Sequence, residues 1–263
     1  MSQSMSKAEI KAGKKKNEAV ETVVVIVEAL IIALLFRTFL YQPFSIPTAS
    51  MQSTLMIGDY FIANKWAWGF GKYSFPIALP FNGRLLSFAT PQQGDVAVFH
   101  NISNEDYIKR VIGLPGDRIQ MKAGRLYING TMLDRQQVGT GVDVDSSMND
   151  VPVTLYEETL PNGVKHTVQE ISDDQGLDNT AEYVVPAGHY FMMGDNRDRS
   201  ADSRVLQQVG YVPLDAFVGK AEARFFSIKN NLPPWQLWEW PANVRWDRMF
   251  QGVDQDYTTT PAQ

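Results

Sequence analysis

GDVAVFHNISNEDYIKRVIGLPGDRIQMKAGRLYING, residues 94–130, has the pattern of several short β-strands joined by tight turns. Apolar and often β-branched side chains alternate with polar ones, which is the period of a strand with one buried face. The turn motifs LPGD at 114–117 and ING at 128–130 interrupt the alternation. The predicted strands are 94–99, 106–114, 117–121 and 125–130.

Five segments further along the chain have the same pattern, so we expect a mainly β body with two antiparallel sheets. Residues 131–181 are rich in Gly, Asp, Asn and Ser and are patterned more weakly. We interpret this stretch as an inserted β-hairpin subdomain. The five segments are 152–158, 164–170, 182–186, 189–193 and 215–226.

Composition limits the possible classes of protein. The chain has 263 residues, of which 44% are hydrophobic and 20% are charged, and this balance excludes an intrinsically disordered protein. It has no cysteine, which excludes a disulfide scaffold, thiol catalysis and cysteine-ligated metal sites. The net charge is −5 although residues 1–20 are basic, so the remainder is acidic. An acidic body argues against nucleic acid as a partner.

An apolar segment, TVVVIVEALIIALLF at 22–36, follows the basic head and predicts one transmembrane helix over 20–41. A cleaved signal peptide would have a similar pattern, but no small-x-small cleavage site follows the segment. A buried core helix is the other alternative, although core helices are seldom apolar on every side. The preceding lysines predict a cytoplasmic tail over 1–19 and an exported domain over 42–263.

The three histidines offer no catalytic triad, because none lies in a pattern with a nearby serine and aspartate. The spacing of Asp195, Asp198 and Asp202 faintly matches a calcium loop, but it lacks the ligand order and terminal Glu of an EF-hand. The sequence therefore offers neither a histidine-based triad nor a recognisable metal site. The histidines are His100, His166 and His189.

A serine and a lysine stand out by their settings. Ser50 lies in IPTASMQSTLMIGD (46–59), a turn of small residues close after the apolar segment. Lys109 lies inside the strand pattern of 106–114. If its side chain is buried, desolvation lowers its pKa from ~10.4 towards ~8 and makes a neutral amine available as a base. The pattern alone favours a simpler interpretation, a surface lysine on an edge strand.

Four blocks in this order, behind an apolar N-terminal segment, resemble bacterial type I signal peptidase, the membrane serine protease that removes signal peptides from exported preproteins. The resemblance implies a Ser–Lys dyad on a β-rich fold, without metal or cofactor. It also implies a protein of the bacterial inner membrane with its catalytic domain on the periplasmic or outer face; this sequence predicts a single span, whereas some relatives have two. The blocks are IPTASMQSTLMIGD (46–59), GDVAVF (94–99), DYIKRVIGLPGD (106–117) and GDNRDRSADSR (194–204).

The resemblance also implies roles by motif position. Ser50 matches the family nucleophile and Lys109 the general base, and Ser200 matches a serine that hydrogen-bonds the lysine. Thr48 stands where the family usually has a serine whose hydroxyl, together with the Ser50 backbone N–H, stabilises the oxyanion. The residues that match a structural charge network around the site are Arg110, Asp195, Asp202 and Arg204.

Eight further residues match positions that line shallow apolar pockets in the family. Such pockets accept small side chains and explain a preference for Ala-x-Ala cleavage sites. The implied partners are the signal peptides of preproteins, the lipid bilayer and, as an open possibility, the protein-export machinery. The matching residues are Phe44, Ile46, Leu55, Phe61, Val98, Asp106, Tyr107 and Ile108.

Two positions depart from the family pattern. Ser53 stands where the family often has Pro, and loss of the Pro is expected to loosen the turn after Ser50. Arg199 stands where the family often has Asn. Neither change removes a catalytic atom.

The segment 231–251 near the C-terminus is rich in tryptophan. Such a cluster suits a membrane interface, and it equally suits a segment packed on the sheet. The tryptophans are Trp235, Trp238, Trp240 and Trp246.

Two other kinds of function stay open on the sequence alone. One is a different Ser–Lys protease, either a self-cleaving repressor-type peptidase or a dedicated maturation peptidase of a secretion system. The apolar anchor and the lack of a DNA-binding domain in the sequence disfavour the repressor type. The other is a non-catalytic, membrane-anchored β-domain that binds envelope partners.

Overall fold

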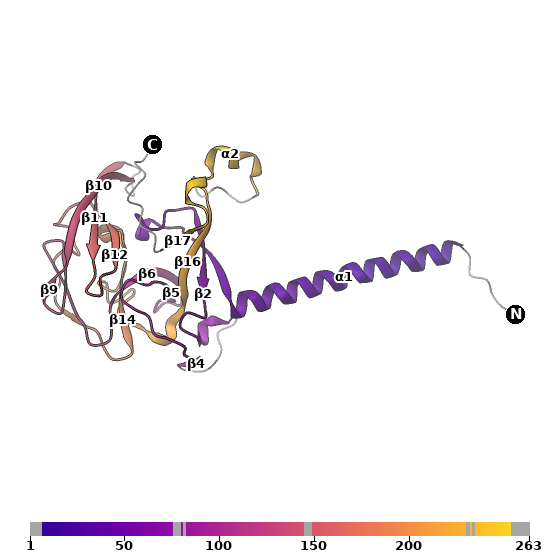
Figure 1. Ribbon diagram of the computed structural model, residues 1–263, viewed down its shortest axis with the longest axis horizontal. Helices are drawn as coiled ribbons and strands as arrows, with labels where there is room; N and C mark the ends of the chain where they lie inside the picture. Colours follow the sequence, from indigo (N-terminus) through magenta and orange to yellow (C-terminus); the bar gives the residue numbers. More distant parts are fainter. Residues whose placement is uncertain are drawn as a thin grey trace.

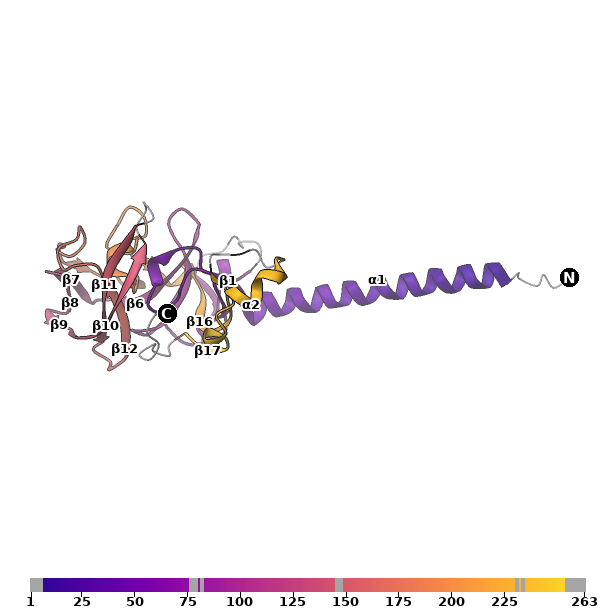
Figure 2. The ribbon, with the colours of Figure 1, turned by 90° about the horizontal axis from the view of Figure 1, so that it is seen from above.

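A long helix and a β-rich body make up the protein (Figures 1 and 2). The computed structural model describes residues 7–75, 80, 83–144, 149–229, 232 and 235–253. Helix α1 (Lys7–Phe39) projects from the body as a rod. Its apolar part, Val20–Phe39, is long enough to cross a membrane and is almost wholly exposed. This exposure argues against a buried core helix.

One eight-stranded sheet forms the centre of the body, in the order β1-β2-β16-β5-β6-β14-β15, with β17 paired to β16. Strand β1 lies at one edge, whereas β6 is enclosed between β5 and β14. The strands are β1 (Tyr41–Ser45), β2 (Asp59–Asn64), β5 (Val96–His100), β6 (Asp106–Gly113), β14 (His189–Met193), β15 (Val212–Pro213), β16 (Phe217–Ser227) and β17 (Gln251–Gly252).

The mainly β class is confirmed, but the described chain forms four antiparallel sheets where two were expected. Gly116, with a φ of 93°, turns the chain sharply after β6, and the next strand leaves the main sheet to pair with β8 and β13. The smaller sheets consist of β13 (Tyr183–Val184), β7 (Arg118–Lys122), β8 (Arg125–Ile128) and β9 (Thr131–Met132); of β10 (Asp134–Val144), β11 (Asp150–Thr159) and β12 (Lys165–Glu170); and of β3 (Phe70–Gly71) and β4 (Arg84–Leu86).

Every segment predicted as a strand contains one, because the alternation of apolar side chains supplies each with a face to bury. The stretch 131–181 forms more than the predicted hairpin. Strands β10 and β11 form the hairpin, and β12 adds a third strand beside β11. We call these three strands the inserted sheet. Strand β10 was hard to predict because Gly139 and Gly141 interrupt its pattern.

Short helical turns connect the strands and form the segment near the C-terminus. In that segment Trp240 packs on Phe226, with ring centroids 4.8 Å apart, whereas the other three tryptophans are between 64% and 73% exposed. Of these four tryptophans, Trp240 alone packs on the sheet, and the segment is also held there by Val244 and Arg248. The turns are η1 (Ala49–Met51), η2 (Lys72–Ser74), η3 (Arg197–Arg199), η4 (Leu214–Ala216), η6 (Leu237–Glu239), α2 (Trp240–Asn243) and η7 (Trp246–Arg248).

Three clusters of buried apolar side chains form the core. One includes Met51 and Phe61 and packs the end of the main sheet that carries β1 and β2. A second is built around Phe217 of β16. The third joins Phe191 of the main sheet to Ile119 of β7. The core therefore binds the small β7–β8 sheet to the central one.

Buried polar contacts join the inserted sheet to residues 194–204. Glu158 of β11 accepts hydrogen bonds from both terminal nitrogens of Arg197, and both side chains are almost completely buried. The backbone N–H of Gln169 in β12 donates to the Asp195 carbonyl at 2.8 Å. The inserted sheet is therefore fixed to this segment by an ion pair and by backbone pairing.

Replacing Glu158 should destabilise the body, because Glu158→Gln leaves the Arg197 guanidinium buried without its counter-charge. Loss of one partner of a buried ion pair costs about 3–5 kcal/mol. Urea unfolding of the full chain in detergent measures the change in free energy of unfolding. The matched control is Glu157→Gln at the preceding residue, a partly exposed partner of Lys165, which should cost below ~1 kcal/mol. Equal effects of the two variants would contradict the prediction.

Candidate active site

A closed loop between β1 and β2 presents Ser50. The Ile46 N–H donates to the Asp59 carbonyl at 2.9 Å and the Gly58 N–H donates to the Ile46 carbonyl at 3.0 Å, so the two ends of the loop are held together. Within the loop the chain makes the single turn η1, and Met51 is completely buried. Ser50 beside it is 9% exposed. The burial of the Met51 side chain therefore fixes the neighbouring Ser50 in a largely buried position.

Ser53 ties this loop to the inserted sheet. Its hydroxyl donates to the Thr167 carbonyl at 2.8 Å, and its φ is 88°. Proline cannot adopt that angle, since its ring holds φ near −65°. The expected loosening of the turn is therefore compensated, because the hydroxyl supplies a hydrogen bond that Pro lacks.

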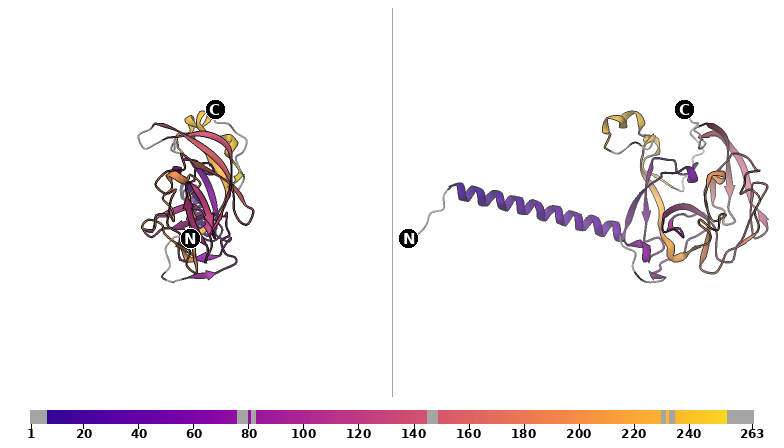
Figure 3. Two further views of the ribbon diagram at one scale, coloured as in Figure 1. Left: turned by 90° about the vertical axis from the view of Figure 1, so that its left-hand side faces the viewer. Right: turned by 180° about the vertical axis from the view of Figure 1, so that it is seen from behind.

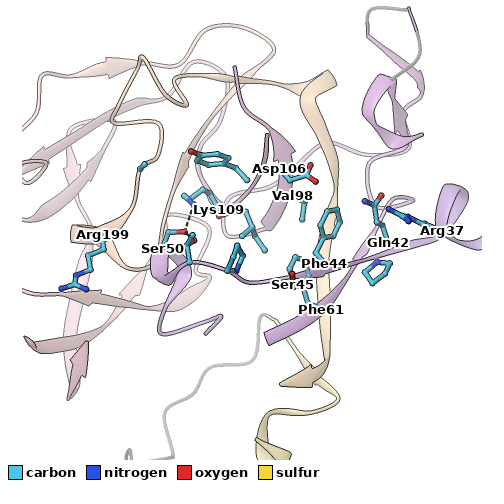
Figure 4. Close-up of a pocket in the computed structure, with 16 residues that line it drawn as sticks. Arg37, Gln42, Phe44, Ser45, Ser50, Phe61, Val98, Asp106, Lys109 and Arg199 are labelled. Carbon is cyan, nitrogen blue, oxygen red and sulfur yellow. Dashed lines mark hydrogen bonds between the residues drawn. The ribbon is translucent and has the colours of Figure 1, made fainter. Parts of the chain in front are cut away.

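Lys109 points from the centre of the main sheet to Ser50 (Figure 4). It lies opposite Ala97 in the β5–β6 ladder and is 3% exposed. Its Nζ donates to Ser50 Oγ at 2.8 Å and to the Ile108 carbonyl at 2.9 Å, and it lies 5.2 Å from the centre of the Tyr107 ring. The surface lysine on an edge strand is therefore the wrong interpretation, since β6 is interior and Lys109 is buried.

Burial lowers the pKa of Lys109 to about 8, because the ammonium loses its hydration. The carboxylates of Asp202 and Asp195 act in the opposite direction but do not cancel the effect. A substantial fraction of the side chain is therefore neutral near pH 8, with a lone pair that can accept a proton from the hydroxyl that it contacts.

Residues 194–204 lie against both members of this pair. A Cβ atom on Gly194 would lie 2.4 Å from the Ser50 carbonyl oxygen and 2.3 Å from Ser200 Oγ, so only glycine fits there. Ser200 is buried, and its hydroxyl makes no hydrogen bond among the described residues. No hydrogen bond joins Ser200 to Lys109 among those formed by these described residues.

The four charged residues of the predicted network form two buried pairs. Arg110 holds Asp195 through two hydrogen bonds of 2.9 and 2.8 Å, and Arg204 holds Asp202 through two of the same lengths. Burial would raise the pKa of each carboxyl, and the paired guanidinium outweighs it, so both pKa values are lowered. The Thr54 hydroxyl, which the sequence did not single out, also donates to Asp195 at 2.6 Å. Both carboxylates therefore stay charged and paired.

A groove with a cavity volume of about 610 Å³ runs past Ser50 and Lys109 (Figure 4). Phe44 and Phe61 stack in it, with ring centroids 5.7 Å apart. Ile46 and Leu55 lie instead in the core beneath, because the chain turns inward after β1. The groove thus contains six of the eight predicted pocket residues. These six are Phe44, Phe61, Val98, Asp106, Tyr107 and Ile108.

The groove also contains residues that the sequence did not assign to it. Arg37, at the end of α1, lines one end, and Arg199 and Ala201 line it near the dyad. In the sequence, Arg37 is only the charged residue near the end of the apolar segment, and Arg199 is only a departure from the family pattern. Their shared position in the groove depends on contacts distant in sequence.

Thr48 lies at the rim of the groove, with an exposed side chain whose Oγ1 is 3.4 Å from Ser50 Oγ. Its backbone is extended, and its side chain makes no capping hydrogen bond to the turn that follows. The hydroxyl is therefore available to a ligand and is not used to support the turn.

None of the three histidines is hydrogen-bonded to Ser50. His166 is buried, with Nε2 3.4 Å from Glu158, and burial lowers its pKa to about 4. Neither His100 nor His189 is hydrogen-bonded to Ser50, whose hydroxyl contacts Lys109 and Thr48. Within the described residues, no group of three or more His, Asp or Glu side chains could hold a metal ion.

Comparison with known proteins identifies the family. The sequence model described as "Signal peptidase, peptidase S26" matches residues 19–226. The chain belongs to this family. It is 36% identical over 244 residues to signal peptidase I of Rickettsia typhi (strain ATCC VR-144 / Wilmington), a match covering 84% of this chain and 89% of the relative. It is 37% identical over 245 residues to signal peptidase I of Rickettsia canadensis (strain McKiel), with the same coverage.

Among solved structures, a crystal structure of a signal peptidase I from Enterococcus faecalis V583 is similar at 28% sequence identity, covering 51% of this chain and 98% of that one, with a TM-score of 0.31. The family model and the curated relatives make the chain a signal peptidase I, a serine peptidase of the S26 type. An enzyme is therefore favoured over a non-catalytic binding domain.

Proposed function

We propose that this signal peptidase cleaves preproteins with Ser50 as nucleophile and Lys109 as general base. The observation that carries the proposal is the 2.8 Å hydrogen bond from Lys109 Nζ to Ser50 Oγ, at a lysine whose burial lowers its pKa to about 8. A neutral amine at this distance can take the hydroxyl proton as the oxygen attacks. No histidine offers a competing base at Ser50.

The reaction is an acyl transfer in two steps. Ser50 Oγ attacks the scissile carbonyl carbon while Lys109 takes its proton, and the resulting ammonium returns a proton to the leaving amine. The signal peptide is then held as an ester on Ser50. Lys109, neutral again, takes a proton from water as the water oxygen attacks the ester carbon, and it returns that proton to Ser50 Oγ as the signal peptide leaves with a free carboxyl group.

The oxyanion that forms at each step needs donors on the open side of Ser50. The Thr48 hydroxyl is one candidate, since it is exposed beside Ser50 Oγ and has no capping role. The Ser50 backbone N–H is the second, because the first N–H groups of a helical turn have no partner within that turn. Both donors lie on the same rigid loop.

The groove fits an extended peptide with small side chains before the cleaved bond. Strand β1 is a sheet edge and lines the groove, so a substrate can pair with its backbone as an added strand. The stacked rings of Phe44 and Phe61 make the nearby pocket apolar and shallow. This supports preproteins with Ala-x-Ala sites as the substrates.

The placement of apolar side chains supports a membrane location. We infer that residues 1–19 are cytoplasmic, that 20–41 cross the membrane, and that 42–263 lie on its outer face. The α2 segment projects from the same side of the body as α1 (Figures 1 and 3). Three tryptophans of this segment, Trp235, Trp238 and Trp246, are exposed, which suits contact with lipid headgroups.

Removal of the base should abolish cleavage. Lys109→Met keeps an unbranched apolar stem but removes the amine, and it should lower kcat/KM for a preprotein in detergent by at least about 10²-fold, as should Ser50→Ala. Lys122→Met, at the end of β7, is the matched control and should stay active.

Because Lys109 must be neutral to act as a base, wild-type kcat/KM should rise with pH through about 8 and then level off. Cleavage retained by Lys109→Met would refute the dyad. A panel of unrelated preproteins separates a general peptidase from a dedicated maturation enzyme.

Removal of the Thr48 hydroxyl should slow catalysis without weakening binding. Thr48→Val keeps the shape and should lower kcat by about 10²–10³-fold with little change in KM, because the contact strengthens only in the transition state. Thr48→Ser keeps the hydroxyl and is the active control. A Thr48→Val enzyme of normal melting temperature and normal kcat would contradict the oxyanion role.

The proposed membrane placement predicts which parts a protease reaches. Protease added outside spheroplasts should digest the body after residue 41 and spare the N-terminal tail. In the same membranes, brominated lipids should quench the exposed tryptophans of the α2 segment. A protected body would reverse the orientation, and unquenched tryptophans would remove the lipid contact.

A further inference from the structure

The groove does not end at Ser50 but continues to Arg199 (Figure 4). In that view Arg199 lies on one side of Ser50, whereas Phe44, Asp106 and Arg37 lie on the other. Arg199 ends the turn η3, and its side chain is 22% exposed. A guanidinium is therefore within reach of a peptide that extends past the nucleophile.

The Arg199 side chain is held in place, but not all of its hydrogen-bond donors are used. Its Nη1 donates to the Val144 carbonyl, and its Nε lies 3.5 Å from Asp143 Oδ2. That carboxylate oxygen also accepts hydrogen bonds of 3.1 Å from Gln169 and from Asn196, so its charge is shared. Among the described residues Arg199 Nη2 has no partner. A guanidinium has five N–H donors, so this one can still bind a further carboxylate.

The direction of the substrate follows from the anchor, and this step rests on the proposed function. Helix α1 joins the body at the end of the groove that Arg37 and Gln42 line. A signal peptide held in the same membrane must enter from that end. The chain after the cleaved bond, which becomes the mature protein, must leave past Arg199.

Arg199 gives that exit end a positive charge. The other charged residues that line the groove are Lys109 at its centre and Arg37 and Asp106 towards the anchor. The buried arginines nearby, Arg110 and Arg204, are already matched by Asp195 and Asp202. The exit end therefore presents Arg199 as its charged group among the described lining residues.

We propose that Arg199 is a specificity-determining residue that favours an acidic side chain at the first or second position after the cleaved bond. A carboxylate there would accept a hydrogen bond from the unpartnered Nη2 and would be attracted by the positive charge of the guanidinium. A lysine there would meet a like charge. The preference acts on the mature part of the preprotein and is separate from the apolar pockets before the cleaved bond.

Two sets of three preproteins test this, one set with Glu, Gln or Lys at the first position after the cleaved bond and the other with the same residues at the second position. For the wild-type full chain in detergent, kcat/KM for Glu should exceed that for Gln by about two- to fivefold at one of these positions, with Lys below Gln. Arg199→Gln should remove the ratio, Arg199→Lys should keep it, and Arg199→Glu should reverse it. High salt should reduce it, since the pair is partly exposed.

Arg37→Gln, at the opposite end of the groove, is the matched control and should leave the ratio unchanged. Each ratio is taken within one enzyme, so a partial loss of folded protein cancels. Equal wild-type rates for Glu and Gln at both positions, or a ratio unchanged in Arg199→Gln, would overturn the proposal while leaving the peptidase activity intact. Cleavage of these substrates by Ser50→Ala would instead overturn the proposed function.

Discussion

Burial of the Lys109 amine is the constraint on which the candidate site depends. In water an amine of this kind holds its proton up to about pH 10, and only removal from water makes the neutral form common near pH 8. Two carboxylates, Asp195 and Asp202, lie close enough to oppose that effect. Each is bound by an arginine through two hydrogen bonds, so their attraction for the lysine proton stays weaker than the effect of desolvation.

The inserted sheet supports this arrangement without lining the groove. It binds the nucleophile loop through the bond from Ser53 to the Thr167 carbonyl, and it binds the 194–204 segment through Glu158 and Arg197. Those are the two pieces of chain that meet at Gly194, where no side chain fits. No described residue between 131 and 181 contacts the cavity, so this part of the chain acts on the site by holding its walls.

Much of this structure could be predicted from the sequence, and the remainder depended on long-range contacts. Strand periodicity located the predicted strands, since it is a local property. Ser50 and Lys109 could be selected by their settings, but not the contact between them, which joins residues 59 apart in the chain. Burial of Lys109 needed the position of β6 inside the sheet. Ile46 illustrates the converse, because the family resemblance implies a groove residue and the turn after β1 sends it into the core.

The junction of helix and sheet has a geometric consequence for the reaction. Helix α1 ends at Phe39 and β1 begins at Tyr41, and the Leu40 carbonyl between them accepts a hydrogen bond of 3.1 Å from the Lys65 N–H. The Phe39 ring is also wedged against Phe70, with centroids 6.0 Å apart. These two contacts join the end of the helix to the body, and the nine residues from Tyr41 to Ser50 span at most ~30 Å when fully extended. Under the proposed membrane placement, this junction keeps Ser50 near the bilayer, so the distance of a peptide bond from the membrane contributes to its selection along with the side chains around it.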